Sequence, residues 1–224
     1  MTKFYRVMYA IFARPVRALF RIHTVNPEKM PADQGCLICA NHTSMLDVLI
    51  LSAGLGRQIR YMAKKELFGI PGLKQLITAL GAYPIDRGGA DVASLKQTIA
   101  FLEEGELVGI FPQGTRHPGA DPSTTPIKSG VGMVAWHAKA AVVPAYIKTE
   151  GNRVRPFRRT ELILGDPIPF EDLGFTKGSI SQYRAASEKV FSEICLLGGY
   201  TRPAPAGADK TDTSSAAGAE EASS

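Results

Sequence analysis

Apolar runs of strand length alternate along most of this chain with segments whose apolar side chains recur at helical spacing. The runs predict buried strands, and the periodic segments predict amphipathic helices. We expect strands at 36–40, 57–63, 81–85, 107–111, 141–148 and 161–164, with a loop or short edge strand at 25–35. We expect helices from the turn after residue 42 to about residue 52, and at 73–80, 92–102, 128–139 and 180–197. This alternation predicts a single α/β domain with a largely parallel or mixed sheet flanked by helices.

The first segment, residues 3–22, contains basic residues and no acidic residue. At about 100° per residue, the cations fall within an arc of roughly 80° on a helical wheel, and apolar side chains occupy the opposite side. The cations are Lys3, Arg6, Arg14, Arg17 and Arg21, and the apolar residues are Phe4, Met8, Ile11, Phe12, Leu19 and Ile22. This pattern is typical of an amphipathic helix on an anionic membrane surface, although a helix that packs only on its own domain is the alternative. Pro15 is expected to kink the helix or to begin a second one.

The last segment, residues 203–224, consists mostly of Ala, Gly, Ser, Thr, Pro and acidic residues. This composition cannot bury a core, so it predicts a disordered tail. The sequence therefore divides into a membrane-associating helix at 1–24, a folded domain at 25–202 and a tail at 203–224, and the length of 224 residues suits this division.

The charge of the chain is unevenly distributed. The formal net charge is +5, while residues 203–224 carry −3, so the remainder carries +8. A body this basic predicts an anionic partner, such as nucleic acid, a phosphate ligand or a membrane surface. The basic turn at 153–159 lacks any nucleic-acid-binding motif or interleaved aromatic residues, so we expect a solvated or membrane-facing turn and no nucleic-acid partner.

Other signals restrict the protein class further. No apolar run approaches the roughly 18 residues of a membrane-spanning helix, and the N-terminus does not resemble a secretory signal. The three cysteines form an odd number, which predicts a reducing compartment rather than a disulfide framework. Cys36 and Cys39 lie in an apolar run without a second ligand pair, so we expect buried side chains and no metal site. The sequence also lacks a phosphate-binding loop and a nucleophile elbow.

The best candidate for chemistry is a histidine in the turn between two apolar segments. His42 follows the run 36–40, and Asp47 stands five residues later. On one continuous helix, residues five apart point roughly 140° away from each other, so His42 must lie in the turn before the helix for the side chains to meet. Thr43 or Ser44 is then expected to cap the helix, and Asp47 to reach back to the imidazole. Such a pair can act as a general base, although a buried histidine beside a capped helix is the plainer interpretation.

Four sequence blocks in order resemble the glycerolipid acyltransferases, the family that includes 1-acyl-glycerol-3-phosphate acyltransferase. The first block is Asn41-His42-x-Ser44-x-x-Asp47, and the second is Gly81-Ala82-Tyr83-Pro84-Ile85-Asp86-Arg87. The third is Phe111-Pro112-Gln113-Gly114-Thr115-Arg116, and the fourth is Val142-Val143-Pro144-Ala145. The resemblance covers about residues 36–150 and implies a glycerol-3-phosphate acyltransferase-like fold and acyl transfer from a thioester to the hydroxyl of a lysophospholipid.

The resemblance also implies roles for individual residues. His42 is expected to remove the proton from the acceptor hydroxyl while Asp47 orients the imidazole, so that the acceptor attacks the thioester directly and no acyl-enzyme forms. Arg87 and Arg116 are expected to bind the acceptor phosphate, and Lys65 is a further candidate.

Three more residues of the third block complete the expected substrate-binding set. Gly114 would allow close backbone approach to the reacting groups, and Gln113 and Thr115 stand on either side of it. No cofactor is implied, because acyl-coenzyme A or acyl-carrier protein is a co-substrate. The expected location is the cytoplasmic face of the cell membrane, with the protein held peripherally by membrane lipids.

One position departs from the family pattern, since Gln113 stands where the third block usually carries Glu. An amide still forms hydrogen bonds but lacks the negative charge, so the acceptor stays open. It could be 1-acyl-glycerol-3-phosphate, another lysophospholipid, glycerol 3-phosphate or a lyso-ornithine lipid. A binding module for acidic lipids without turnover is the second hypothesis, and the intact His42 and Asp47 favour the enzyme.

Overall fold

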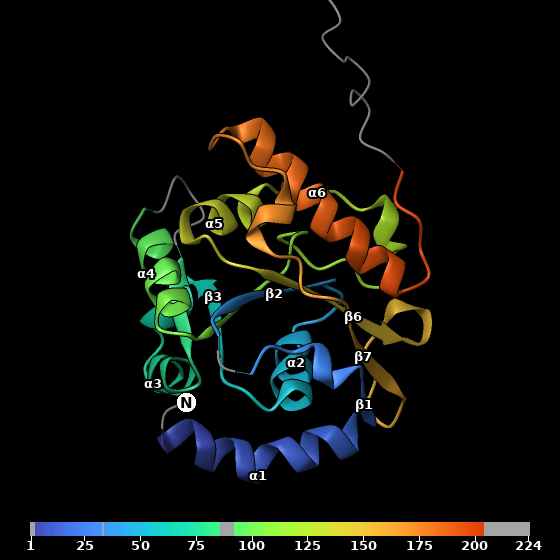
Figure 1. The fold of residues 1–224 in the computed structure, drawn as a ribbon. Helices are drawn as coiled ribbons and strands as arrows, with labels where there is room; N and C mark the ends of the chain where they lie inside the picture. The colour runs from blue at the N-terminus through green and yellow to red at the C-terminus, as the bar shows by residue number, and fades with distance from the viewer. Residues whose placement is uncertain (1–2, 33, 86–91, 204–224) are drawn as a thin grey trace, which may run out of the picture.

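In the residues that the computed structural model describes, 3–32, 34–85 and 92–203, one seven-stranded sheet runs between layers of helices (Figure 1). The strands are β1 (Ile22–Val25), β2 (Cys36–Ala40), β3 (Ile59–Lys64), β4 (Ala82–Ile85), β5 (Leu107–Ile110), β6 (Val142–Thr149) and β7 (Thr160–Leu164). The α-helices are α1 (Lys3–Leu19), α2 (Asp47–Leu55), α3 (Leu73–Ala79), α4 (Val92–Glu103), α5 (Gly130–Ala138) and α6 (Ile180–Leu197). The short helical turns are η1 (Pro27–Lys29), η2 (Lys65–Gly69), η3 (Pro122–Thr124), η4 (Glu150–Asn152) and η5 (Phe170–Leu173).

The sheet is mixed and mostly parallel, with the strand order β1-β7-β6-β2-β5-β3-β4. β6 and β7 pair antiparallel, and the other neighbours pair in parallel. β2 lies in the middle of the sheet, and all five of its residues are buried. The prediction of an α/β domain with a largely parallel, mixed sheet is therefore confirmed.

The two faces of β2 contribute to two separate cores. Cys36, Ile38 and Ala40 pack with residues of α2, whereas Leu37 and Cys39 pack with residues of α5 and α6, as the two-residue period of a strand requires. Figure 1 shows α5 and α6 on one side of the sheet and α2 on the other, with α1 outside α2. The hydroxyl of Tyr9 in α1 donates a hydrogen bond to the carbonyl oxygen of Ala53 in α2 at 3.1 Å.

The N-terminal region differs from the sequence prediction in two ways. α1 continues through Pro15, so no second helix begins there. β1 was not predicted as a strand, yet it pairs with β7 from Ile22 to Val25, so the sheet begins inside the segment assigned to residues 1–24. Ile22 is consequently buried in the sheet instead of lying on the outer face of the helix. Both Phe20 and Ile22 are buried in the core that also contains residues of α2.

Among the described residues, no helix is long and apolar enough to cross a bilayer. Cys36, Cys39 and Cys195 are free and buried, as expected for Cys36 and Cys39, and burial raises the pKa of the Cys36 thiol to about 12. The expected tail from residue 204 onward lies outside the described residues, as do Asp86 and Arg87 of the second block.

Close packing between α5 and α6 generates a test of the fold. A methyl group at Gly132 would lie 2.1 Å from the backbone oxygen of Tyr183, whereas Gly130 in the same helix has open space around it. We expect Gly132→Ala to lower the free energy of unfolding by about 1–3 kcal/mol, measured by urea denaturation, because α6 must move away. Gly130→Ala is the matched control, and equal stability of the two variants would contradict this account of the packing.

Candidate active site

The two turns with the most candidate residues follow adjacent parallel strands. β2 and β5 pair from Cys36–Leu107 to Cys39–Ile110, so the turns after them leave the same edge of the sheet. Open α/β sheets place ligand-binding loops at this carboxyl edge. The topology therefore brings the first and third sequence blocks together, although they are far apart in the chain.

Asn41 fixes the point where the chain leaves β2. Its side-chain oxygen accepts a hydrogen bond from the Ile147 amide at 2.7 Å, and its side-chain nitrogen donates to the Ile147 carbonyl oxygen at 3.1 Å. Asn41 is buried, so its amide needs both partners. These two bonds attach the start of the turn to β6 while the backbone bends away from the sheet, a role that the sequence analysis did not assign.

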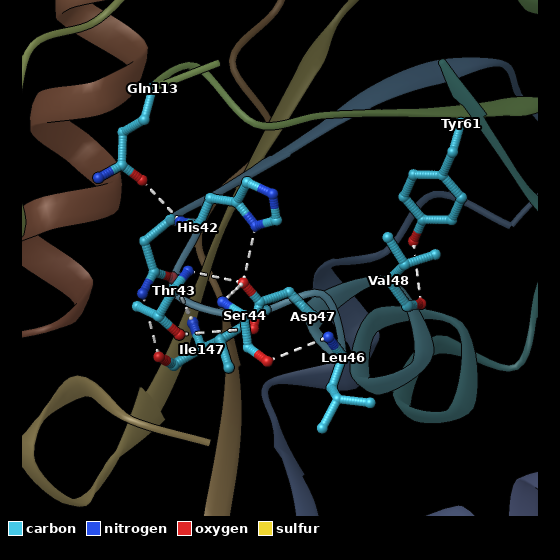
Figure 2. Close-up of polar contacts among 10 residues, drawn as sticks. His42, Thr43, Ser44, Leu46, Asp47, Val48, Tyr61, Gln113 and Ile147 are labelled. Atoms are coloured by element: carbon cyan, nitrogen blue, oxygen red, sulfur yellow. Dashed lines mark hydrogen bonds and ion pairs between the residues drawn. The ribbon is translucent and has the colours of Figure 1, made fainter. Parts of the chain in front are cut away.

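Asp47 and His42 form the predicted pair (Figure 2). One carboxylate oxygen of Asp47, Oδ2, lies 2.8 Å from Nδ1 of His42 and also accepts the backbone amides of Thr43 at 2.7 Å and Ser44 at 2.8 Å. The side chain of Asp47 is 0% exposed and that of His42 is 16% exposed. An ionised carboxylate can only accept, so it selects the tautomer with the proton on Nδ1 and leaves Nε2 as the acceptor.

The predicted cap of α2 is wrong. Leu46 occupies the N-cap position and forms no side-chain cap, while Ser44 Oγ accepts the Leu46 amide at 3.1 Å. The bonding runs in the other direction, since Asp47 at the first position of α2 accepts the amides of the preceding turn. A carboxylate at this end of a helix also interacts favourably with the helix dipole.

Two residues of the third block and His117, which follows it, hold His42 in place through three contacts. The His42 amide donates to Oε1 of Gln113 at 2.6 Å, and the His42 carbonyl oxygen accepts the His117 amide at 2.8 Å. The imidazole stacks on the ring of Phe111, with centroids 4.0 Å apart and planes 15° apart. Backbone and ring are therefore both fixed, and the orientation of the ring does not depend on Asp47 alone.

Gln113 lies within the protein rather than at its surface. It is 4% exposed, and its Nε2 donates to Thr125 Oγ1 at 2.8 Å while its Oε1 accepts the His42 amide. Thr125 Oγ1 in turn donates to the Pro122 carbonyl oxygen at 2.7 Å. In this arrangement Gln113 positions His42, and the predicted contact between Gln113 and the substrate stays a prediction.

Arg202 anchors the far side of this loop, and the sequence analysis missed it. Its Nη1 donates to the carbonyl oxygens of Ser123 at 3.0 Å and Thr125 at 2.8 Å. Its Nε donates to Glu188 of α6 at 2.8 Å, and both side chains of this ion pair are largely buried. A continuous set of hydrogen bonds thus links α6, Arg202, Thr125, Gln113 and the backbone of His42. A single arginine next to a low-complexity tail gives no signal of this role.

The remaining predicted residues that the structure describes lie around the same edge of the sheet. Thr115 and Arg116 are exposed in the turn after β5, and Gly114 has a φ of 70°, a left-handed conformation that suits glycine. The Lys128 stem packs against Gly114, with atoms 3.0 Å from the place of a Cβ, which adds an unpredicted cation near this turn. Lys65 is exposed and directly follows β3, which is parallel to β5.

Comparison with known proteins gives consistent results. Residues 21–148 match the protein-family model described as Acyltransferase. The 1-acyl-sn-glycerol-3-phosphate acyltransferase of Bacillus subtilis is 35% identical over 168 residues, covering 72% of this chain and 82% of the relative. The Helicobacter pylori protein of the same name is 34% identical over 135 residues, covering 58% of this chain and 56% of the relative. In fold, the chain is similar to the crystal structure of the 1-acyl-sn-glycerophosphate acyltransferase PlsC from Thermotoga maritima, with a TM-score of 0.61, 21% identity and coverage of 88% and 84%.

The contacts of Gln113 generate a test of the site that does not depend on its chemistry. Gln113→Leu keeps the approximate volume but removes both hydrogen bonds, so we expect faster hydrogen exchange at the His42 amide and a loss of about 1–3 kcal/mol of stability. Gln113→Glu retains an acceptor for the His42 amide, and the Thr125 hydroxyl can donate to the new carboxylate in place of the Pro122 carbonyl oxygen. Exchange measured by NMR should therefore change much less in Gln113→Glu, and unchanged exchange in Gln113→Leu would contradict the positioning role.

Proposed function

The chain belongs to the acyltransferase family, and on that premise we propose that it transfers a fatty acyl group from a thioester to the free hydroxyl of 1-acyl-glycerol-3-phosphate, forming phosphatidic acid. The observation that carries this proposal is the arrangement of His42 and Asp47. Asp47 accepts from Nδ1 of the imidazole, so Nε2 is left to accept a proton from a bound hydroxyl. The names of the Bacillus subtilis and Helicobacter pylori relatives support this choice of acceptor.

The proposed reaction proceeds in two steps at one base. Nε2 of His42 takes the proton of the acceptor hydroxyl while the hydroxyl oxygen attacks the thioester carbonyl, and the buried Asp47 carboxylate stabilises the imidazolium that forms. The tetrahedral intermediate then collapses, the carbon–sulfur bond breaks, and the leaving thiolate recovers the proton from His42. The products are the diacyl phosphate and a free thiol, and the base returns to its starting state.

No side-chain nucleophile is needed in this scheme. Ser44 carries a hydroxyl two residues after His42 in the sequence. Its Oγ accepts a hydrogen bond from the Leu46 amide at the start of α2. Direct attack by the acceptor depends on holding the two substrates and the base together, and the contacts of Phe111, Gln113 and His117 with His42 provide a rigid base for that.

The acceptor phosphate is proposed to bind the cations around the same sheet edge. Arg116 lies in the turn directly after β5, and its exposed guanidinium suits bidentate binding of a phosphate. Lys65 follows the neighbouring strand β3, and Arg87 follows β4 in the sequence. The donor is proposed to be acyl-coenzyme A or acyl-carrier protein, since both present the thioester that the chemistry requires.

α1 is proposed to hold the enzyme on the cytoplasmic face of an anionic membrane. Tyr5 and Ala13 face the protein and are buried, whereas Val7 and Ile11 are 57% and 55% exposed. The cations of α1 are exposed as well, so the helix presents an apolar stripe beside a basic one. These cations are Lys3, Arg6, Arg14 and Arg17. Such a helix lies in the interface with its apolar stripe among the acyl chains and its cations at the anionic headgroups.

The function is tested by measuring acyl transfer with both donors and a panel of acceptors. The panel consists of 1-acyl-glycerol-3-phosphate, lysophospholipids without a terminal phosphate, glycerol 3-phosphate and a lyso-ornithine lipid. We expect the highest kcat/KM with 1-acyl-glycerol-3-phosphate, and we expect His42→Ala to lower kcat by about 10²–10⁴-fold. His137→Ala, at an exposed position of α5, is the control. Near-normal turnover by folded His42→Ala would refute the role of His42 as the base.

The membrane proposal is tested by sedimentation with vesicles that contain anionic lipid. Reversing Arg6, Arg14 and Arg17 to Glu should weaken binding by about a hundredfold or more, because each basic residue near the surface contributes about 1 kcal/mol. Reversing Lys96, Lys177 and Arg184, which are exposed on or beside α4 and α6, makes the same change in net charge and is the matched control. Equal loss in both variants would show that net charge, and not α1, controls binding.

A further inference from the structure

The turn between β6 and β7 exposes an aromatic residue in an unusual conformation. Phe157 is 74% exposed, and its φ is 62°. A bulky side chain is uncommon in the left-handed region, and an exposed phenylalanine there contributes nothing to the core. We propose that this turn is a second membrane contact, in which Phe157 enters the interfacial layer of an anionic bilayer between flanking arginines. The inference rests on the proposed attachment of α1 to the membrane.

The backbone ties this turn to the end of α1. The Phe157 amide donates to the Leu19 carbonyl oxygen at 2.6 Å, and the Thr160 amide donates to the Arg21 carbonyl oxygen at 3.5 Å. β1 and β7 then run side by side from Ile22 and Thr160. Phe157 therefore lies next to the exposed end of the helix that we propose to lie on the membrane, and Figure 1 shows the β7 end of the sheet beside the end of α1 that leads into β1.

The charges around Phe157 favour an anionic surface over an apolar protein partner. Residues 150–161 contain four arginines and two glutamates, a net charge of +2. Arg158 lies 3.8 Å from Glu150 and Arg159 lies 2.9 Å from Glu161, and the arginine side chains of both pairs remain more than 60% exposed. The other two arginines, at positions 153 and 155, precede Phe157 in the sequence and are exposed, and the guanidinium of Arg153 lies beside Gly119. Arginines around an exposed aromatic residue are suited to the headgroup layer, where the ring reaches the acyl chains and the cations stay at the phosphates.

The turn also fixes how the enzyme meets the membrane. A single helix leaves a protein free to rotate about the helix axis on the surface, whereas a second contact beside one end removes that freedom. The tip of the turn is held by the end of α1, and α1 packs on α2, the helix that begins at Asp47. Two contacts on one rigid unit would therefore give the His42 turn a defined orientation relative to the bilayer.

Vesicle sedimentation with Phe157→Asn tests the proposal, because Asn tolerates the left-handed conformation and removes the ring. We expect binding to anionic vesicles to weaken about tenfold, with acyl transfer to detergent-dispersed acceptor unchanged. Ile180→Ser is the matched control, since Ile180 is 79% exposed at the start of α6, across the sheet from α1. Wild-type binding by Phe157→Asn would overturn the proposal. If the wild-type protein shows no acyl transfer to detergent-dispersed acceptor, that result would instead count against the catalytic function. Vesicle binding that is unchanged by reversal of the α1 arginines would count against the attachment of α1 to the membrane.

A fluorescence measurement tests insertion directly. The chain has one tryptophan, Trp136, so Phe157→Trp in a Trp136→Phe background reports on the turn alone. We expect its emission to shift to shorter wavelength with anionic vesicles and to be quenched by brominated acyl chains, whereas Ile180→Trp in the same background should show neither change. Emission from the Phe157→Trp variant that brominated chains do not quench would overturn the proposal. A blue-shifted emission without lipid, together with self-association that Phe157→Asn abolishes, would identify a second copy of the chain as the occupant and overturn it as well.

Discussion

The buried carboxylate of Asp47 is the constraint on which the candidate site depends. An ionised group without contact with water is strongly unfavourable unless hydrogen bonds or an opposite charge compensate it. Here one oxygen accepts two backbone amides and the imidazole, so the turn from His42 to Ser44 wraps around that atom. The same contacts that make the buried charge tolerable also select the tautomer of His42. Folding of the turn and preparation of the base are thus one event.

A second set of contacts holds His42 from outside its own turn. Gln113, Phe111 and His117 belong to the loop after β5, and that loop is fixed through Thr125 to Arg202 at the end of the described chain. An amide at position 113 is well suited to this task, because it accepts from one partner and donates to the other. The departure from the family pattern therefore affects the support of His42.

Sequence patterns predicted the parts of the fold and site that are encoded locally. The apolar run at 36–40 and the pair of His42 and Asp47 follow from spacing within a few residues, and both were predicted correctly. β1 was missed because Ile22 continues the apolar period of α1, and only pairing with β7 decides its conformation. Contacts with distant partners, such as Gln113 with the His42 amide or Arg202 with Glu188, have no local signal, because they require the topology first.

The order in which the chain is made therefore matters for this enzyme. Asn41 bonds to a residue 106 positions later, His42 to one 71 positions later, and Thr125 to one 77 positions later. During synthesis, the first half of the chain can form the His42 turn but lacks β6 and Arg202, which support it. The base would then acquire its final geometry only after residue 202 has left the ribosome. α1 precedes the site residues in the chain. With the membrane attachment proposed for α1, that helix would be on the bilayer before the chemistry is complete, so a growing chain could be delivered to its substrate without acting on it.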